Sequence, residues 1–94
     1  MAKSYTVTGR VKVFPQKGGW MYVRVPRRIT AETKSLADRG LVAVRATVGA
    51  FSWDTSLLPM GDGTQFIALP AKVRKAEAIE LGSRVTVRVQ LRRR

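Results

Sequence analysis

Residues 69–89 have the sequence LPAKVRKAEAIELGSRVTVRV, in which the spacing of apolar residues changes from that of a helix to that of a strand. Pro70 suits the first position of a helix, where no backbone N–H is needed, and Gly82 suits the positive φ that often follows a helix C-terminus. From Val85 to Leu91 every second residue is apolar, and the residues between are mostly basic or polar. The stretch therefore predicts a strand end, a short helix, and a half-buried strand with a basic outer face.

The rest of the chain continues the strand pattern. Gly9 falls on the apolar face of the first strand, where a glycine predicts a bulge that curls the sheet. A second short helix is predicted from Thr30, taken as its N-cap, to about Ala37. A turn is predicted from Pro15 to Gly19. The alternating stretches predict five further strands, at Ser4–Phe14, Trp20–Val25, Leu41–Val48, Phe51–Leu57 and Thr64–Leu69.

Two halves of the chain, about 4–48 and 49–92, follow one plan of strand, loop, strand ending in proline, short helix and strand. Residues 22–29 correspond to residues 66–73, and Gly40 corresponds to Gly82. Neither half is large enough to bury its own valine face, so we expect the halves to close on each other. The predicted fold is all-β: a single domain over 1–94 forming a small closed or split β-barrel of about six strands, with internal pseudo-twofold duplication and two short helices.

The net charge of the chain indicates which kinds of molecule it can bind. The 94 residues contain 18 Lys and Arg against 6 Asp and Glu, a formal net charge of +12, which favours nucleic acid or another polyanion as the partner. There is no Cys and no His, so the usual zinc ligands and general bases are missing, and we expect no metal and no cofactor. No apolar run is long enough to span a membrane, so we expect a cytoplasmic location. We also expect the protein to be a monomer or a homodimer.

The last strand offers the first candidate site. Arg84, Arg88 and Arg92 share one side of it, and each lies about 13 Å from the next at roughly 3.3 Å per residue, a ladder suited to phosphates. The alternative is a solvated, charged exterior that prevents edge pairing. The residues predicted to extend the ladder are Arg10, Lys12, Arg27, Arg28, Arg74 and Lys75.

Aromatic residues offer a second candidate. Trp20 and Tyr22 alternate with Met21, Val23 and Val25, so both rings are predicted on one exposed face, where bases of a single strand could stack. The alternative is that these rings pack under a helix or loop.

A third candidate is a loop from Trp53 to Gly63 that contains Asp54, Ser56 and Asp62. A small-ligand or protein-interaction module centred on this loop is the alternative function. Catalysis by Asp54 and Asp62 is the more remote alternative, because Ser56 has no histidine to activate it. We predict a non-catalytic binding module.

Motifs in the chain resemble two known families. Pro70, Val73, Arg74, Lys75, Ile79, Gly82, Val85 and Val87 resemble the AbrB/SpoVT-type swapped-hairpin barrel signature. The whole chain resembles the family called domain of unknown function 1905, through Gly18-Gly19-Trp20, Val25-Pro26, the run from Trp53 to Gly63, and Val73-Arg74-Lys75. Ser83 departs from the acidic residue that relatives tend to have after the glycine. The resemblance implies a small β-barrel and supplies no activity.

Overall fold

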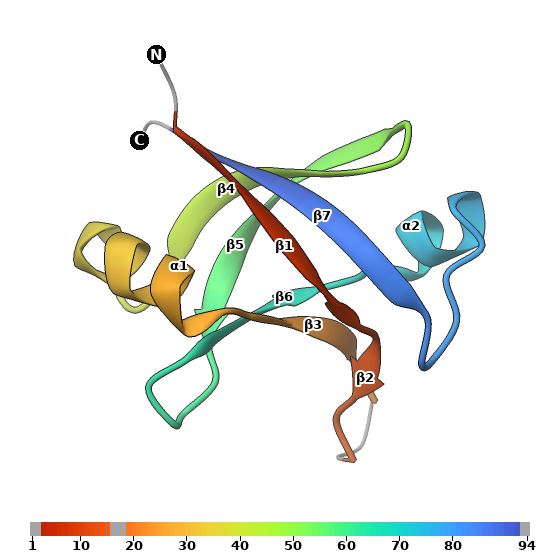
Figure 1. The fold of residues 1–94 in the computed structure, drawn as a ribbon, viewed down its shortest axis with the longest axis horizontal. Helices are drawn as coiled ribbons and strands as arrows, with labels where there is room; N and C mark the ends of the chain where they lie inside the picture. The colour runs from red at the N-terminus through yellow and green to blue at the C-terminus, as the bar shows by residue number, and fades with distance from the viewer. Residues whose placement is uncertain (1–2, 16–18, 93–94) are drawn as a thin grey trace.

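The computed structural model of the chain describes residues 3–15 and 19–92. Residues 16–18 of the predicted turn lie outside this described part. The strands and helices are labelled in Figure 1. They are β1 (Ser4–Arg10), β2 (Lys12–Val13), β3 (Met21–Val25), α1 (Arg27–Thr33) continued by a 3₁₀ turn (Lys34–Leu36), β4 (Val42–Val48), β5 (Phe51–Pro59), β6 (Gln65–Ala68), α2 (Ala71–Ala76) and β7 (Arg84–Leu91).

The strands form one antiparallel sheet in the order β1-β7-β4-β5-β6-β3-β2. β1 and β2 stand at opposite ends of this order but are consecutive in the chain, separated only by Val11. The sheet therefore curls until its two ends meet, giving a nearly closed barrel (Figure 1). The predicted all-β barrel with two short helices is confirmed, and it has seven strands because the first predicted strand is divided in two.

The predicted bulge at Gly9 is not formed, and the strand is divided elsewhere. Gly9 pairs regularly with Val85 inside β1. The break comes at Val11, whose N–H donates to Ser83 O at 2.8 Å and whose carbonyl accepts from the Gly82 N–H at 2.9 Å. Val11 thus leaves β1 by bonding to the turn before β7, and the chain then turns to pair with β3.

The core lies inside the barrel and is built from the alternate residues of each strand. Ile29 of α1 and Val73 of α2 are also fully buried, so each helix adds one side chain to this core. Burying one such side chain contributes roughly 1.5 to 3 kcal/mol relative to leaving it in water. The fully buried strand residues include Val7, Val23, Val25, Val44, Leu57, Ile67 and Val87.

The two helices begin in the same way. The carbonyl of Pro26 accepts hydrogen bonds from the N–H groups three and four residues later, and so does the carbonyl of Pro70. The prediction that Thr30 is the N-cap is therefore wrong. Helix α1 already begins at Arg27, and Thr30 is buried within it. Figure 1 shows α1 and α2 on opposite sides of the barrel.

One of the strand pairs between the two halves, that of β3 with β6, brings together two residues that correspond in the two halves of the sequence. Val23 of β3 lies directly opposite Ile67 of β6. This pairing agrees with a pseudo-twofold relation, while the limits of the two repeats stay a prediction. Within the described ranges, none of the helices has the length and apolar character needed to cross a membrane.

Candidate nucleic-acid interface

The outer surface of β1, β7, β4 and the first part of β5 is mostly hydrophilic. Each of these strands alternates between buried residues inside the barrel and exposed or half-buried residues outside it. We call this surface the polar sheet face. Its members are Ser4, Thr6, Thr8, Arg10, Arg45, Thr47, Ser52, Asp54, Arg84, Thr86, Arg88 and Gln90.

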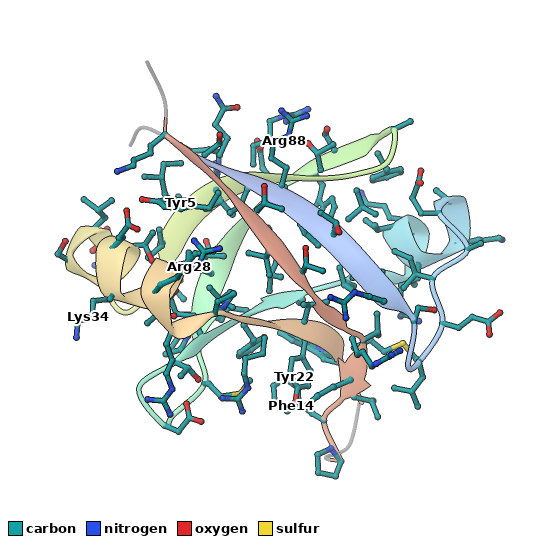
Figure 2. The ribbon with its side chains drawn as sticks, in the orientation of Figure 1. Tyr5, Phe14, Tyr22, Arg28, Lys34 and Arg88 are labelled. Carbon is teal, nitrogen blue, oxygen red and sulfur yellow. The ribbon has the colours of Figure 1, made fainter. Side chains whose placement is uncertain are left out.

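The antiparallel register sets arginines beside hydroxyl groups on this face. Arg10 lies opposite Arg84, so two cations face each other across β1 and β7. Arg88 has Thr6 on one side and Thr47 on the other. Figure 2 shows Arg88 on the outside of the barrel. Guanidinium and hydroxyl groups both donate hydrogen bonds, so the face is rich in donors for an anion.

A depression of about 260 Å³ lies on this face near the start of β1 and the end of β7, lined by Ser4, Arg45, Thr47, Arg88 and Gln90. Two guanidinium groups, two hydroxyls and one amide thus surround one space. Phosphate oxygens accept hydrogen bonds from all three kinds of group, and arginine can bind phosphate through two N–H groups at once.

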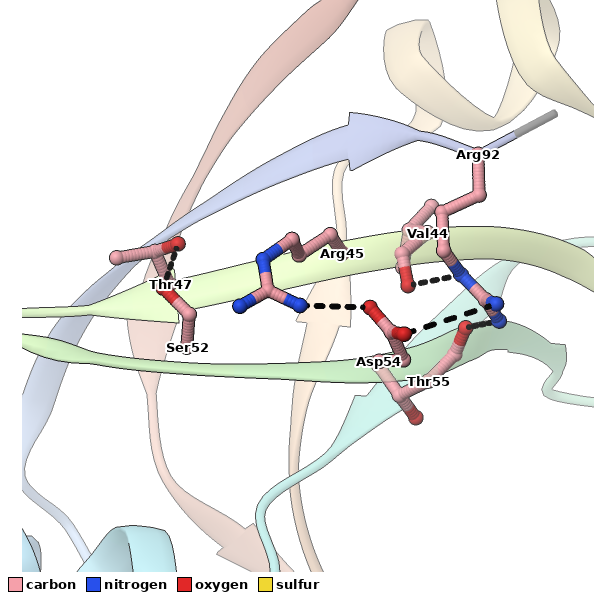
Figure 3. A network of polar contacts seen from close by, with 7 residues as sticks. All are labelled: Val44, Arg45, Thr47, Ser52, Asp54, Thr55 and Arg92. Carbon is pink, nitrogen blue, oxygen red and sulfur yellow. Dashed lines mark hydrogen bonds and ion pairs between the residues drawn. The ribbon is translucent and has the colours of Figure 1, made fainter.

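Asp54 is the one carboxylate among the described residues of this face, and it pairs with Arg45 of the face and lies near Arg92, which follows β7 (Figure 3). Its Oδ1 accepts from Arg45 Nη1 at 3.0 Å, and its Oδ2 lies 4.0 Å from Arg92 Nη1. Arg92 also donates from Nε to the Val44 carbonyl and from Nη2 to the Thr55 carbonyl, both at 3.0 Å. Arg92 is thus held by its neighbours.

The three arginines of the predicted ladder differ in how far other groups of the protein engage them. Arg84 and Arg88 are exposed, and within residues 3–15 and 19–92 no side-chain hydrogen bond or carboxylate holds either of them. Arg92 reaches the same side of the sheet, but its guanidinium is occupied by two carbonyls and Asp54. Arg10 joins them on the face, although its Nη1 donates to Gly82 O at 3.1 Å.

The other predicted basic residues lie elsewhere. Lys12 is on β2, opposite Tyr22. Arg27 and Arg28 are exposed on α1, and Lys75 is exposed on α2 beside Arg74. The two helices lie on opposite sides of the barrel, so the cations of α1 and those of α2 are set apart from each other (Figure 1).

The expected pair of exposed rings is not formed. Trp20 is 59% exposed, but Tyr22 is only 9% exposed. Phe14 follows β2 and stacks on Tyr22 with ring centroids 4.1 Å apart, and Phe66 packs edge-on against both rings. Tyr22 thus belongs to a small aromatic cluster on the outside of β3 and β6. For Tyr22, packing against other side chains, which was the alternative to an exposed stacking surface, is what the structure shows.

The predicted loop from Trp53 to Gly63 is mostly strand β5. Trp53 is 8% exposed and points into the barrel, whereas Asp54 lies on the outer face. Ser56 is half-buried two residues further along β5. Successive side chains of a strand point to opposite faces, so Trp53 is separated from Asp54 and Ser56, which share the outer face. Within the described part of the chain, no three acidic residues gather as a metal site.

Asp62 lies in the turn after β5, where it organises the turn itself. It accepts hydrogen bonds from the side chain and the backbone N–H of Thr64, and Arg24 Nη1 donates to its Oδ2 at 3.1 Å. These bonds, those from Thr64 foremost, lower the pKa of Asp62 from 3.8 to about 2. Asp62 is therefore a carboxylate fixed by the turn and is not brought together with Asp54.

Arg45 and Thr47 were missed by the reasoning from sequence. The signal was present, because Val42, Val44 and Ala46 alternate with Arg45 and Thr47 in the sequence, which implies that Arg45 and Thr47 face outward. What the sequence lacked was the neighbour relation: β4 pairs with β7, which brings Thr47 opposite Arg88 and Arg45 opposite Gln90.

Comparison with known proteins gives one family. The family model described as Domain of unknown function (DUF1905) matches residues 8–89. No curated protein matches the chain. The matched range runs from β1 into β7 and includes both helices, so it covers nearly the whole barrel.

Proposed function

The chain belongs to the DUF1905 family, and since the description of that family assigns no activity, we propose a function from the site itself. The protein is a non-catalytic binding module that binds nucleic acid through phosphate contacts on the polar sheet face. The AbrB/SpoVT-like resemblance of residues 70–87, a cytoplasmic location and a monomeric or homodimeric state belong to the same proposal.

The observation that carries the proposal is the depression shared by Arg45 and Arg88. Arg45 gives one guanidinium N–H to Asp54 and keeps its other donors, so it and Arg88 can both donate hydrogen bonds to an anion in this space. The hydroxyls of Ser4 and Thr47 add donors at the same place. Because phosphate contacts fix position without reading bases, such a face binds with little sequence preference.

The whole-chain charge supports a polyanion in place of a single small anion. The net charge is +12, and Asp54 is the single acid on the described polar sheet face. Arg84 and Arg88 are four residues apart on β7, about 13 Å at ~3.3 Å per residue, so they would contact different phosphates. Each phosphate neutralised releases condensed counterions, which makes binding depend steeply on salt.

The alternative, a small-ligand or protein-interaction module centred on Trp53–Gly63, has weaker support. Its aromatic residue is buried, and its two aspartates are engaged separately by Arg45 and Arg24. The same separation weakens a catalytic role for Asp54 and Asp62, since a general acid and base must reach one substrate together.

A salt titration of oligonucleotide binding tests the proposal. We expect a fluorescently labelled duplex to bind with an affinity that falls linearly with salt on a log–log plot. Arg84→Gln or Arg88→Gln should each reduce that slope by about 0.9 for duplex DNA and by about 0.7 for a single strand. Lys34→Gln is the matched control, because it removes an exposed cation next to α1, away from the face.

Two results would overturn the proposal. One is the absence of binding to both single-stranded and duplex oligonucleotides at physiological salt, roughly 0.15 M. The other is a slope that changes as much with Lys34→Gln as with the two β7 variants, which would mean that only total charge matters.

A further inference from the structure

A second concave surface lies between the start of β3 and helix α2. It is a groove of about 330 Å³, lined chiefly by Trp20, Met21, Leu69, Pro70, Ala71 and Arg74. Its floor is held together by the backbone, since the Leu69 N–H donates to Met21 O at 2.9 Å. None of these residues belongs to the polar sheet face.

Trp20 is the most exposed large apolar side chain among the described residues, whereas Trp53, the other tryptophan, is buried. The backbone of Trp20 is anchored, because its carbonyl accepts a hydrogen bond from the Phe14 N–H at 3.0 Å. An indole ring on an anchored backbone at the rim of an apolar groove is a surface on which a second flat ring can stack.

Arg74 supplies a fixed cation to the same groove. Its Nε donates to the Leu69 carbonyl at 3.0 Å, which orients the guanidinium plane and uses one of its five N–H groups. No carboxylate within residues 3–15 and 19–92 pairs with Arg74, so its remaining donors are available to an anion. The groove therefore combines an aromatic surface, an apolar floor and one oriented cation.

We infer that this groove receives an unstacked base of single-stranded nucleic acid, with the base on the Trp20 ring and a neighbouring phosphate at Arg74. The inference rests on the proposed function and deepens it, because it names the form of nucleic acid that binds. A planar ring that carries an adjacent anion matches the groove, and an acidic partner matches the net charge of +12. Bases of a duplex are stacked in the interior and cannot enter.

Binding of a 12-nucleotide single strand and of a duplex of the same length tests the inference. Trp20→Ala should weaken single-strand binding by about tenfold, since stacking on an aromatic side chain accounts for at least that much per base. The same change should leave duplex affinity within twofold. Leu36→Ala is the matched control, because it removes another exposed apolar side chain, one that lies next to α1.

Acrylamide quenching of tryptophan fluorescence provides a second readout on the unmodified protein. Trp20 is exposed and Trp53 is buried, so acrylamide quenches mainly Trp20. We expect a saturating single strand to protect this fluorescence and a saturating duplex to leave it unprotected.

The outcomes separate the two proposals. If neither oligonucleotide binds the wild-type protein, the proposed function fails and the groove inference fails with it. If both bind, but Trp20→Ala weakens them equally or not at all, the groove inference alone is overturned. Unchanged acrylamide quenching in the presence of saturating single strand also overturns it, whatever the affinities.

Discussion

Val23 fills the space in front of Gly9, where β1 crosses close to β3. A Cβ added to Gly9 would lie 3.1 Å from Cγ1 of Val23, which is fully buried. Valine is stiff at χ1, so it cannot turn away easily. We predict that Gly9→Ala lowers the free energy of unfolding by about 1 to 2 kcal/mol, because overpacking outweighs the gain of ~0.4 to 1 kcal/mol from a less flexible unfolded chain. Urea unfolding measures this.

A double-mutant cycle with Val23→Ala tests the cause. Removing Cγ1 should make Gly9→Ala neutral or stabilising in the Val23→Ala background, although Val23→Ala is itself destabilising because it leaves a cavity. If Gly9→Ala costs the same in both backgrounds, the contact with Val23 is not the reason for the glycine.

Arg92 and Arg84 should respond differently to the same change. The Arg92 guanidinium is bound to two backbone carbonyls and lies near Asp54 (Figure 3), whereas Arg84 has no such bonds among the described residues. Arg92→Gln should therefore lower the free energy of unfolding by about 1 kcal/mol and barely change the salt slope of binding. Arg84→Gln should change the slope and leave stability within ~0.5 kcal/mol. Equal slopes for both variants would contradict this division.

Asp54 opposes binding on the polar sheet face. Asp54→Asn removes the one negative charge there and releases Arg45 from its carboxylate partner, while Arg92 stays bonded to two carbonyls. We predict that this variant binds oligonucleotides severalfold more tightly and with a steeper salt slope, since more free cations can neutralise phosphates. Fluorescence anisotropy in low and high salt measures both. Glu80→Gln, an acid in the turn before β7, makes the same charge change off the face and is the control.

Asp62 should give a pH dependence to stability. Its pKa is lowered to about 2 in the folded protein by hydrogen bonds from Thr64 and Arg24, against an ordinary value of 3.8. The stabilisation from the ionised carboxylate is therefore fully present above about pH 4 and is lost as the pH falls through about 2. Between these values wild-type stability should fall relative to Asp62→Asn, which has no carboxyl to titrate. Parallel curves of urea midpoint against pH would exclude this role.

Local patterns predicted most of the fold. The period of two in Val85, Val87 and Val89 requires a strand with one buried face, whatever surrounds it, and Pro70 and Gly82 limit the helix before it. The sequence predicts a bulge at Gly9 because it shows only that a side chain is absent there. The reason for the absence is Val23, fourteen positions away, which only the closed barrel brings near.

The candidate site was predicted in part. Arg84 and Arg88 follow from the outward positions of one strand and need no tertiary information. Arg45 joins Arg88 only because β4 pairs with β7, and Arg92 leaves the ladder because the carbonyls of Val44 and Thr55 and the carboxylate of Asp54 engage its guanidinium. Tyr22 was placed outside by alternation, but Phe14 covers it, so an outward position did not mean exposure.

The sequence by itself determined the strands, the proline-led helix after Pro70, the inward valine faces and the excess of positive charge. These depend on the backbone period and on composition, which are local or summed properties. Only the tertiary structure decided which cations are neighbours, which are held by Asp54 and which ring stays exposed. The physical reason is that electrostatic and packing contacts depend on distance in space, and strand pairing brings together residues that are far apart in the chain.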